Sequence, residues 1–87
     1  MRRFEEAIEA HTRAQQAFQQ VGDAHSEAQA WLGLGLDHAN ADVREKAVDA
    51  LSRAAVLFEA TGDDHTTAAV RHLIVQIQEG PDSEESA

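Results

Sequence analysis

The sequence predicts an all-α domain, built as a stack of antiparallel helical hairpins. Three observations predict it. The 87-residue chain matches itself when shifted by 40 residues, its apolar residues recur at three- and four-residue steps, and it contains one proline and five glycines. So few turn-forming residues favour long helices, and the apolar spacing gives each helix one stripe to bury. No segment alternates with the two-residue period of a strand.

The internal repeat is the most specific of these signals. Gly22-Asp23-x-His25 aligns with Gly62-Asp63-x-His65 in the same register that aligns Phe18 with Phe58. Further identities in this register pair Glu5 with Glu45, Ala7 with Ala47, Ala10 with Ala50, Arg13 with Arg53, Ala14 with Ala54 and Ala28 with Ala68. One helix–turn–helix unit cannot bury its own apolar face, so successive units are expected to stack.

Turn residues place the helix ends. Gly22 and Gly62 can adopt the left-handed conformation that ends a helix, and the aspartates that follow them can cap the next one. The run Asn40-Ala41-Asp42 breaks the second helix, and Asp42 with Glu45 resembles a capping box. Gly80-Pro81 is expected to end the fourth helix. The predicted domain therefore spans residues 1–80, and residues 81–87 are expected to form a flexible acidic tail.

The middle of the chain carries a known repeat pattern. It reads Trp31-x2-Leu34-Gly35-x2-His38 and then Ala47-x3-Leu51, with Ala54 one turn on. This resembles the tetratricopeptide repeat (TPR), W-x2-L-G-x2-Y followed by A-x3-F and P. His38 replaces the tyrosine, Leu51 the phenylalanine and Glu59 the proline. The resemblance implies that small residues let two helices approach closely, and that large ones fill the space between repeats. The residues expected to be buried together are Trp31, Leu34, Ala47, Leu51, Ala54 and Phe58.

The 40-residue spacing resembles the long-repeat TPR regions of bacterial transcription regulators. In that register residues 3–8 resemble the second helix of a repeat, and the fourth helix is a degenerate first helix, since Arg71 and Val75 replace Trp and Gly. The resemblance implies a right-handed α-solenoid fragment that binds a protein or peptide in a concave groove. The implied groove residues are Gln29, Leu32, Gly33, Leu36, Ala39, Asn40, Ala69, His72, Leu73 and Gln76. Such an apolar groove would suit an amphipathic helix or a second copy, unless the long helices simply fill it themselves.

Net charge narrows the classes of partner. Asp and Glu number 16 against 7 Lys and Arg, a formal charge of −9. This surface repels phosphate backbones and anionic lipids, so we expect neither nucleic acid nor a membrane as partner. No apolar run approaches the ~20 residues of a membrane span. Acidic residues follow Met1-Arg2-Arg3 where an export signal needs an apolar stretch, and cysteine is absent, so the expected compartment is the cytoplasm.

The residue inventory argues against catalysis and metal binding. The chain has no cysteine and one lysine, and it lacks a G-x-S-x-G elbow or a phosphate-binding loop. Gly33-x-Gly35 lies within a predicted helix, so it is not a dinucleotide turn. His25 and His65 recur with the turns and are read as turn residues, and no pair at i, i+4 has a third ligand. We therefore expect no enzyme activity, no catalytic residue, no cofactor and no metal.

Two repeats leave both ends of the stack uncovered, whereas a solenoid usually needs about three. The chain is therefore expected to be a fragment of a longer array or to form a homodimer. The fourth-helix stripe Val70, Leu73, Ile74 and Ile77, or the Leu32–Leu36 groove, would make the dimer contact. Two alternatives to partner binding stay open: a self-association module and, more weakly, a small acidic accessory or metal-carrier protein.

Overall fold

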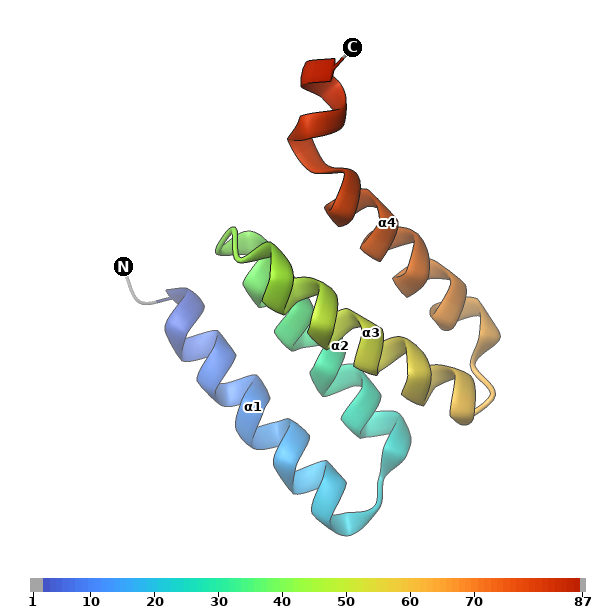
Figure 1. The fold of residues 1–87 in the computed structure, drawn as a ribbon. Coiled ribbons are helices and arrows are strands. Elements are labelled where there is room, and N and C mark those ends of the chain that lie inside the picture. The colour runs from blue at the N-terminus through green and yellow to red at the C-terminus, as the bar shows by residue number, and fades with distance from the viewer. Residues whose placement is uncertain (1–2, 87) are drawn as a thin grey trace.

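The computed structural model describes the backbone of residues 3–86 and the side chains of residues 3–79. This part of the chain forms four helices and no strand: α1 (Arg3–Val21), α2 (Ala24–Asn40), α3 (Arg44–Ala60) and α4 (Asp64–Ser86) (Figure 1). The all-α hairpin stack predicted from the sequence is confirmed. None of the helices within these bounds is long and apolar enough to cross a lipid bilayer.

The two glycine turns have the predicted geometry. Gly22 and Gly62 have φ angles of 75° and 84°, which lie in the left-handed region that glycine adopts without strain. Asp23 then accepts a hydrogen bond from the backbone N–H of Ser26, and Asp63 from that of Thr66, both at 3.1 Å. These bonds satisfy amides at the start of α2 and α4 that have no partner within the helix.

The turn between α2 and α3 differs from the prediction. Asp42 does not cap α3, because it adopts a φ of 65°, and the N-cap is Val43, which makes no side-chain capping bond. The left-handed residue serves the end of α2 instead. It allows the amide of Val43 to donate to the carbonyl of His38 at 2.8 Å, a bond typical of helix C-termini.

Helix α4 is longer than predicted, since it continues through Gly80-Pro81 to Ser86. Pro81 has no N–H to donate to the carbonyl four residues earlier, which weakens a helix without always ending it. The α4 ribbon changes direction in this last part (Figure 1). The helix therefore continues past the predicted boundary at residue 80, and Ala87 of the predicted tail lies outside the described residues.

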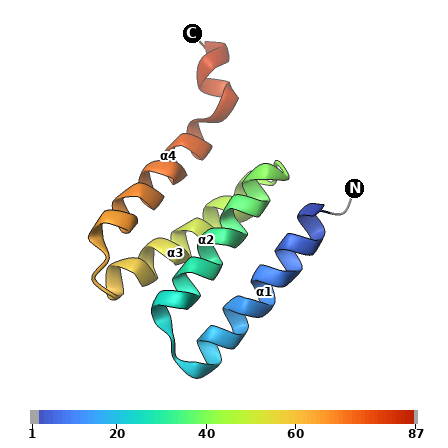
Figure 2. The same cartoon turned by 180° about the vertical axis from the view of Figure 1, so that it is seen from behind.

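Each helix packs on its neighbour in sequence, so that α1 and α4 lie on opposite sides of the α2–α3 pair (Figures 1 and 2). The core lies between α2, α3 and α4, where Leu51 and Phe58 are the largest fully enclosed side chains. The core cluster consists of Ala28, Leu51, Ala54, Ala55, Phe58 and Val70. The burial predicted for Leu34, Ala47, Leu51, Ala54 and Phe58 is confirmed.

Gly35 brings α2 and α3 together, as the sequence implied. A Cβ added at Gly35 would lie 2.5 Å from Leu51 and 3.3 Å from the carbonyl oxygen of Ala47. A side chain at this position would push Leu51 aside, so glycine permits the closest approach of the two helices. Trp31, by contrast, was expected in the core and is only half-buried, with one part packed against the core cluster and the rest in an open cleft.

Candidate partner-binding site

An open cleft of about 510 Å3 lies over Trp31, between α1 and α3. Helix α2 forms its floor and carries the tryptophan, while α1 and α3 form its walls. Because α2 separates α1 from α3, the two walls do not close over the indole. The lining residues are Gln19, Glu27, Trp31, Asp49, Ser52, Arg53, Val56 and Leu57.

Hydrogen bonds hold the floor of this cleft in place. The indole N–H of Trp31 donates to Oε2 of Glu27 at 3.2 Å, and Nε2 of Gln15 donates to the same oxygen at 2.9 Å. Gln15 is the one buried residue of α1 in the described chain, so this bond ties the cleft floor to the α1–α2 contact. The orientation of Trp31 is therefore fixed before any ligand arrives.

A guanidinium group covers the exposed part of the indole. The Cζ of Arg53 lies 5.2 Å from the centre of the Trp31 ring, within the range of a cation–π contact. Its Nε donates to Oδ2 of Asp49 at 3.3 Å, one turn earlier on α3. Both Arg53 and Asp49 are exposed, so water screens their ion pair and Arg53 can move away from the ring at little cost.

The charge of the cleft is negative on balance. Glu27 and Asp49 contribute two carboxylates against the one guanidinium of Arg53, on a chain with a formal charge of −9. Val56, which is 61% exposed, adds an apolar wall. A cleft of this kind favours a ligand that combines a cationic group with an apolar surface.

The ten residues predicted to line a groove lie in different environments. Leu32 and Leu73 pack against the core cluster, and Gly33 lies under the His11 ring of α1. Leu36 stays 41% exposed and is the one large apolar side chain of the ten that reaches that level. Ala39 is half-buried, and the exposed members are Gln29, Asn40, Ala69, His72 and Gln76. The face is therefore more polar than the sequence suggested, because the long helices use part of their apolar surface to cover their own core.

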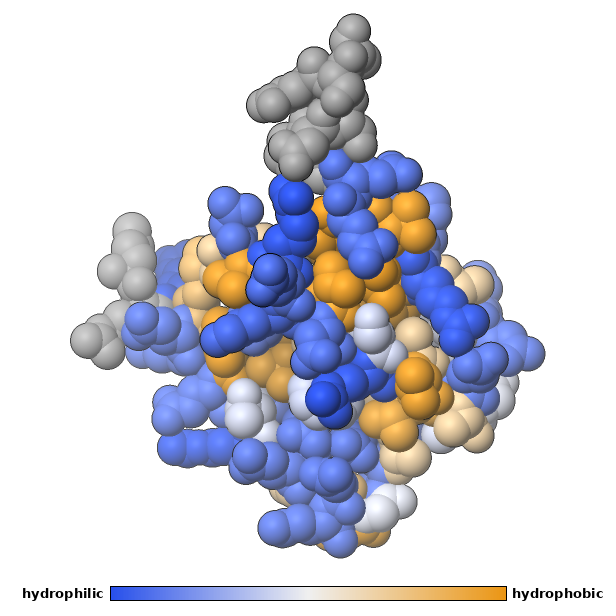
Figure 3. Space-filling view, viewed as in Figure 1, coloured by the Kyte–Doolittle hydropathy of each residue, from blue (hydrophilic) through white to orange (hydrophobic). Residues whose placement is uncertain are grey.

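The fourth-helix stripe is also largely used within one copy. Val70 is 3% exposed, and Leu73, Ile74 and Ile77 are half-buried against the core cluster. Val70 is therefore covered within one copy, and Leu73, Ile74 and Ile77 are the members of the stripe that keep exposed surface. Apolar side chains still gather on the surface between α3 and α4 (Figure 3), where Val48 and Gln78 line a second cleft of about 310 Å3.

His11 and Asp37 form a close pair between α1 and α2. Nδ1 of His11 lies 2.6 Å from Oδ2 of Asp37, the relationship of a base and its orienting carboxylate in hydrolases. The opposite nitrogen, Nε2, lies 2.6 Å from where a Cβ of Gly33 would stand, so it faces the backbone of α2. The geometry makes this pair a tie between helices.

The remaining histidines are dispersed. Nε2 of His25 lies 3.7 Å from Oδ2 of Asp63, which joins the start of α2 to the α3–α4 turn. The His25 ring also packs on that of Phe58 in a T-shaped arrangement, with the ring centres 5.7 Å apart. In the described part of the chain, the buried Nδ1 of the half-buried His38 has no hydrogen-bond partner. Among the described residues, no three His, Cys, Asp or Glu side chains come close enough to hold a metal ion.

Sequence reasoning missed the cleft because it assigned Trp31 to the core. The available signal was Arg53, which is not part of the apolar stripe of the third helix. No protein-family model, curated protein or solved structure matches this chain, so its fold and its surface geometry carry the functional argument.

Proposed function

We propose that this chain is a non-catalytic protein-interaction module of TPR-like architecture, which binds a segment of a partner protein in the Trp31 cleft. The observation that carries the proposal is the placement of a half-buried tryptophan and a movable arginine in one open cleft. Trp and Arg are enriched among the residues that dominate protein–protein binding energy, above all in pockets that lose water on binding.

The chemistry of the cleft selects the partner segment. A lysine or arginine side chain of the partner would replace the guanidinium of Arg53 on the indole and meet Glu27 and Asp49. An apolar neighbour in the partner would pack on Val56 and Leu57. The net charge of −9 attracts a basic segment over a longer range and speeds its association at low ionic strength.

The groove predicted on α2 and α4 is the second candidate surface. Leu36 favours it, because an exposed leucine flanked by polar residues such as Gln29 and Asn40 can anchor the apolar face of a helix. This face differs from the Trp31 cleft in charge and in position, so one pair of substitutions separates the two candidates.

Selection of peptides from a random library tests the proposal. Peptides enriched on the parent protein are synthesised, and their affinities are measured by fluorescence anisotropy for Val56→Arg, Leu36→Arg and Val75→Arg. All three residues are exposed, so each change adds the same charge without opening the core. Val56→Arg is expected to weaken binding at least tenfold, a loss of about 1.4 kcal/mol, while Val75→Arg leaves it unchanged.

The alternatives give different results. If Leu36→Arg abolishes binding and Val56→Arg does not, the partner occupies the α2–α4 face. If the library yields no binding peptide, or if all three variants bind equally well, the proposed interaction site is wrong.

A further inference from the structure

The two ends of the helix stack expose complementary faces, and the internal repeat shows how each face is covered elsewhere in the same chain. A shift of 40 residues places α1 on α3 and α2 on α4. Helix α2 has a helix on each side, namely α1 before it and α3 after it. Among the described residues, helix α4, its equivalent, has its main helix contact with α3, and α1, the equivalent of α3, has its main helix contact with α2.

Burial on α2 and α4 records this difference. Ala30 shares a helix face with Gly33 and Asp37, which contact α1, and its equivalent Val70 is buried as well, at 5% and 3% exposure. The face toward the following helix behaves differently. Ala28 and Gly35 are buried under α3, whereas their equivalents Ala68 and Val75 are exposed, Val75 at 47%.

Helices α3 and α1 show the reverse pattern. Ala55 and its equivalent Gln15 are both buried, at 3% and 7% exposure, on the side that meets the following helix. The alanines of α3 that meet α2 are also buried, Ala50 at 4% and Ala54 at 0%. Their equivalents on α1 are uncovered, since Ala10 is exposed and Ala14 is half-exposed.

We infer that copies of this chain associate head to tail, with α1 of one copy covering α4 of another as α3 covers α2 within a copy. The occupant of the α4 face is thus a second copy, because α1 is the repeat-equivalent of α3, and α3 covers α2 within each copy. The contact uses the two ends of the stack and leaves the Trp31 cleft free, so it does not depend on the proposed function.

Substitutions at the repeat-equivalent positions set the strength of the contact. Val75 is the repeat-equivalent of Gly35. It would face Ala7 and His11 of the neighbouring copy, whereas Gly35 faces Ala47 and Leu51 within its own copy. A valine in place of a glycine keeps the helix axes farther apart, so the contact between copies is weaker than the internal one.

Charge complementarity supports the pairing. Asp49 lines the cleft over Trp31 within one copy. In the 40-residue register, the equivalent of Trp31 is Arg71 and the equivalent of Asp49 is Glu9.

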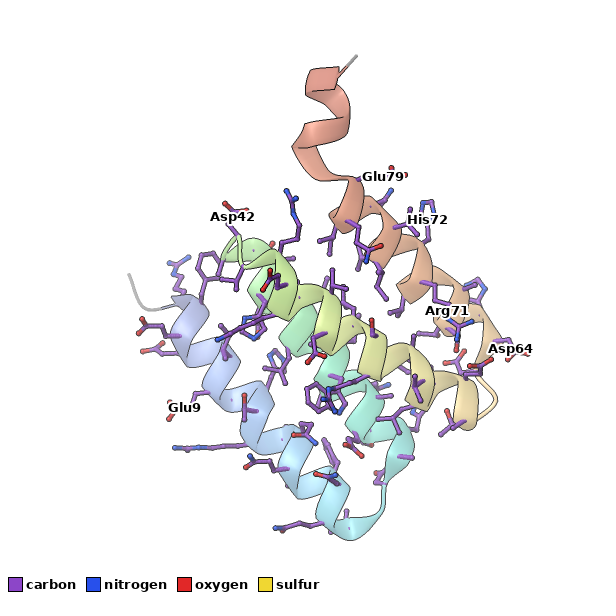
Figure 4. The ribbon with its side chains drawn as sticks, in the orientation of Figure 1. Glu9, Asp42, Asp64, Arg71, His72 and Glu79 are labelled. Atoms are coloured by element: carbon purple, nitrogen blue, oxygen red, sulfur yellow. The ribbon has the colours of Figure 1, made fainter. Side chains whose placement is uncertain are left out.

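Within one copy Arg71 donates to Glu59 at 2.9 Å and Arg13 donates to Glu9 at 3.2 Å, both in exposed ion pairs that exchange at little cost. The head-to-tail contact would exchange these partners and bring the Arg71 guanidinium toward the Glu9 carboxylate. Figure 4 shows Glu9 projecting outward from α1 and Arg71 on α4, at opposite sides of one copy. A single copy cannot join them, and two copies can.

The symmetry follows from the use of two different faces. Such a contact is heterologous, so it adds copies in one direction and forms open chains rather than a closed dimer. Each copy carries a formal charge of −9, so repulsion limits the association at low ionic strength and added salt promotes it.

Disulfide trapping tests the inference, since the natural chain has no cysteine. An Ala7→Cys variant with an affinity tag is mixed with an untagged Val75→Cys variant and oxidised, and the products are separated by size. The mixture is expected to yield several times more tagged–untagged dimer than a control mixture of Ala7→Cys with Val56→Cys. The double variant Ala7→Cys/Val75→Cys is expected to give a ladder of covalent oligomers that intensifies with salt.

Two results would overturn the inference. One is a mixture that cross-links no better than the Val56→Cys control. The other is Val75→Cys alone cross-linking as readily as the mixture, which would indicate a two-fold contact between α4 helices. Exchange of the two charges is an independent test. Glu9→Arg in the tagged variant should reduce the fraction of trapped dimer severalfold. Adding Arg71→Glu to the untagged variant should restore that fraction. No restoration would remove the Glu9–Arg71 pairing from the proposed contact.

Discussion

The imidazole of His11 lies directly on Gly33, with Nε2 2.6 Å from the position that a Cβ of Gly33 would occupy. The missing side chain is what lets the ring cross from α1 to Asp37 on α2. Gly33 therefore belongs to the α1–α2 contact, although the sequence placed it in a binding groove.

The effect of Gly33→Ala on the free energy of unfolding is expected to change sign when the His11 ring is removed. The added methyl meets the His11 ring, and such overpacking costs about 1–3 kcal/mol, against a gain of up to about 1 kcal/mol in helix propensity. In the parent we expect a net loss of up to about 2 kcal/mol. In a His11→Ala background the same change is expected to stabilise by up to about 1 kcal/mol. Urea unfolding of the four proteins measures both effects.

Gly35 is expected to respond differently, because its neighbour Leu51 is fully buried and cannot move aside. Gly35→Ala should destabilise by about 1–3 kcal/mol with or without His11. Ala47→Leu, which fills the same contact from α3, should cost a similar amount. Unfolding midpoints equal to that of the parent would show that α2 and α3 do not approach as closely as described.

The caps of α2 and α4 make stability depend on pH in the acid range. Hydrogen bonds from the side chain and the backbone N–H of Ser26 hold the pKa of Asp23 below its ordinary value of 3.8, and Thr66 does the same for Asp63. A lowered pKa in the folded state favours the folded state fully above the unfolded value. That stabilisation is lost as the pH falls through the lower, folded value.

Asparagine at either cap separates titration from capping, because its side-chain oxygen accepts the same bond without ionising. Asp23→Asn and Asp63→Asn are expected to flatten the loss of stability between about pH 5 and pH 2.5, with little change at neutral pH. Asp42→Asn is the matched control, since Asp42 caps no helix. If Asp42→Asn reduces the loss of stability at acid pH equally, the two cap aspartates are not the source of that loss. Unfolding midpoints across this range give the comparison.

Most helix limits and most of the core could be predicted from the sequence because they depend on local and periodic signals. Gly22 and Gly62 supply the backbone freedom that their turns require, and Leu51 and Phe58 fall on the buried stripe of α3. The prediction for Asp42 was wrong because one residue cannot both adopt the left-handed turn and cap α3. Gly80-Pro81 was read as the end of α4, whereas the helix continues to Ser86.

The surface was harder to predict, because it depends on how far each helix overlaps its neighbours. Helical periodicity places Leu32 and Leu36 on one side of α2, yet Leu32 packs on the core and Leu36 is exposed. Trp31 shows the same difficulty. Its burial depends on the gap between α1 and α3, two helices that are both packed on α2 and are separated by it.

The most direct test of the account uses Trp31 itself, the one tryptophan of the chain. Its fluorescence emission is recorded while a selected basic peptide that contains no tryptophan is added to the parent and to Val56→Arg. If the peptide enters the cleft, it excludes water from the indole. The emission of the parent should then shift to shorter wavelength in a saturable manner, with a midpoint at the dissociation constant from anisotropy. Val56→Arg should give that shift only at tenfold or more higher peptide concentration. Saturable binding by anisotropy with no change in Trp31 emission would contradict the proposed site.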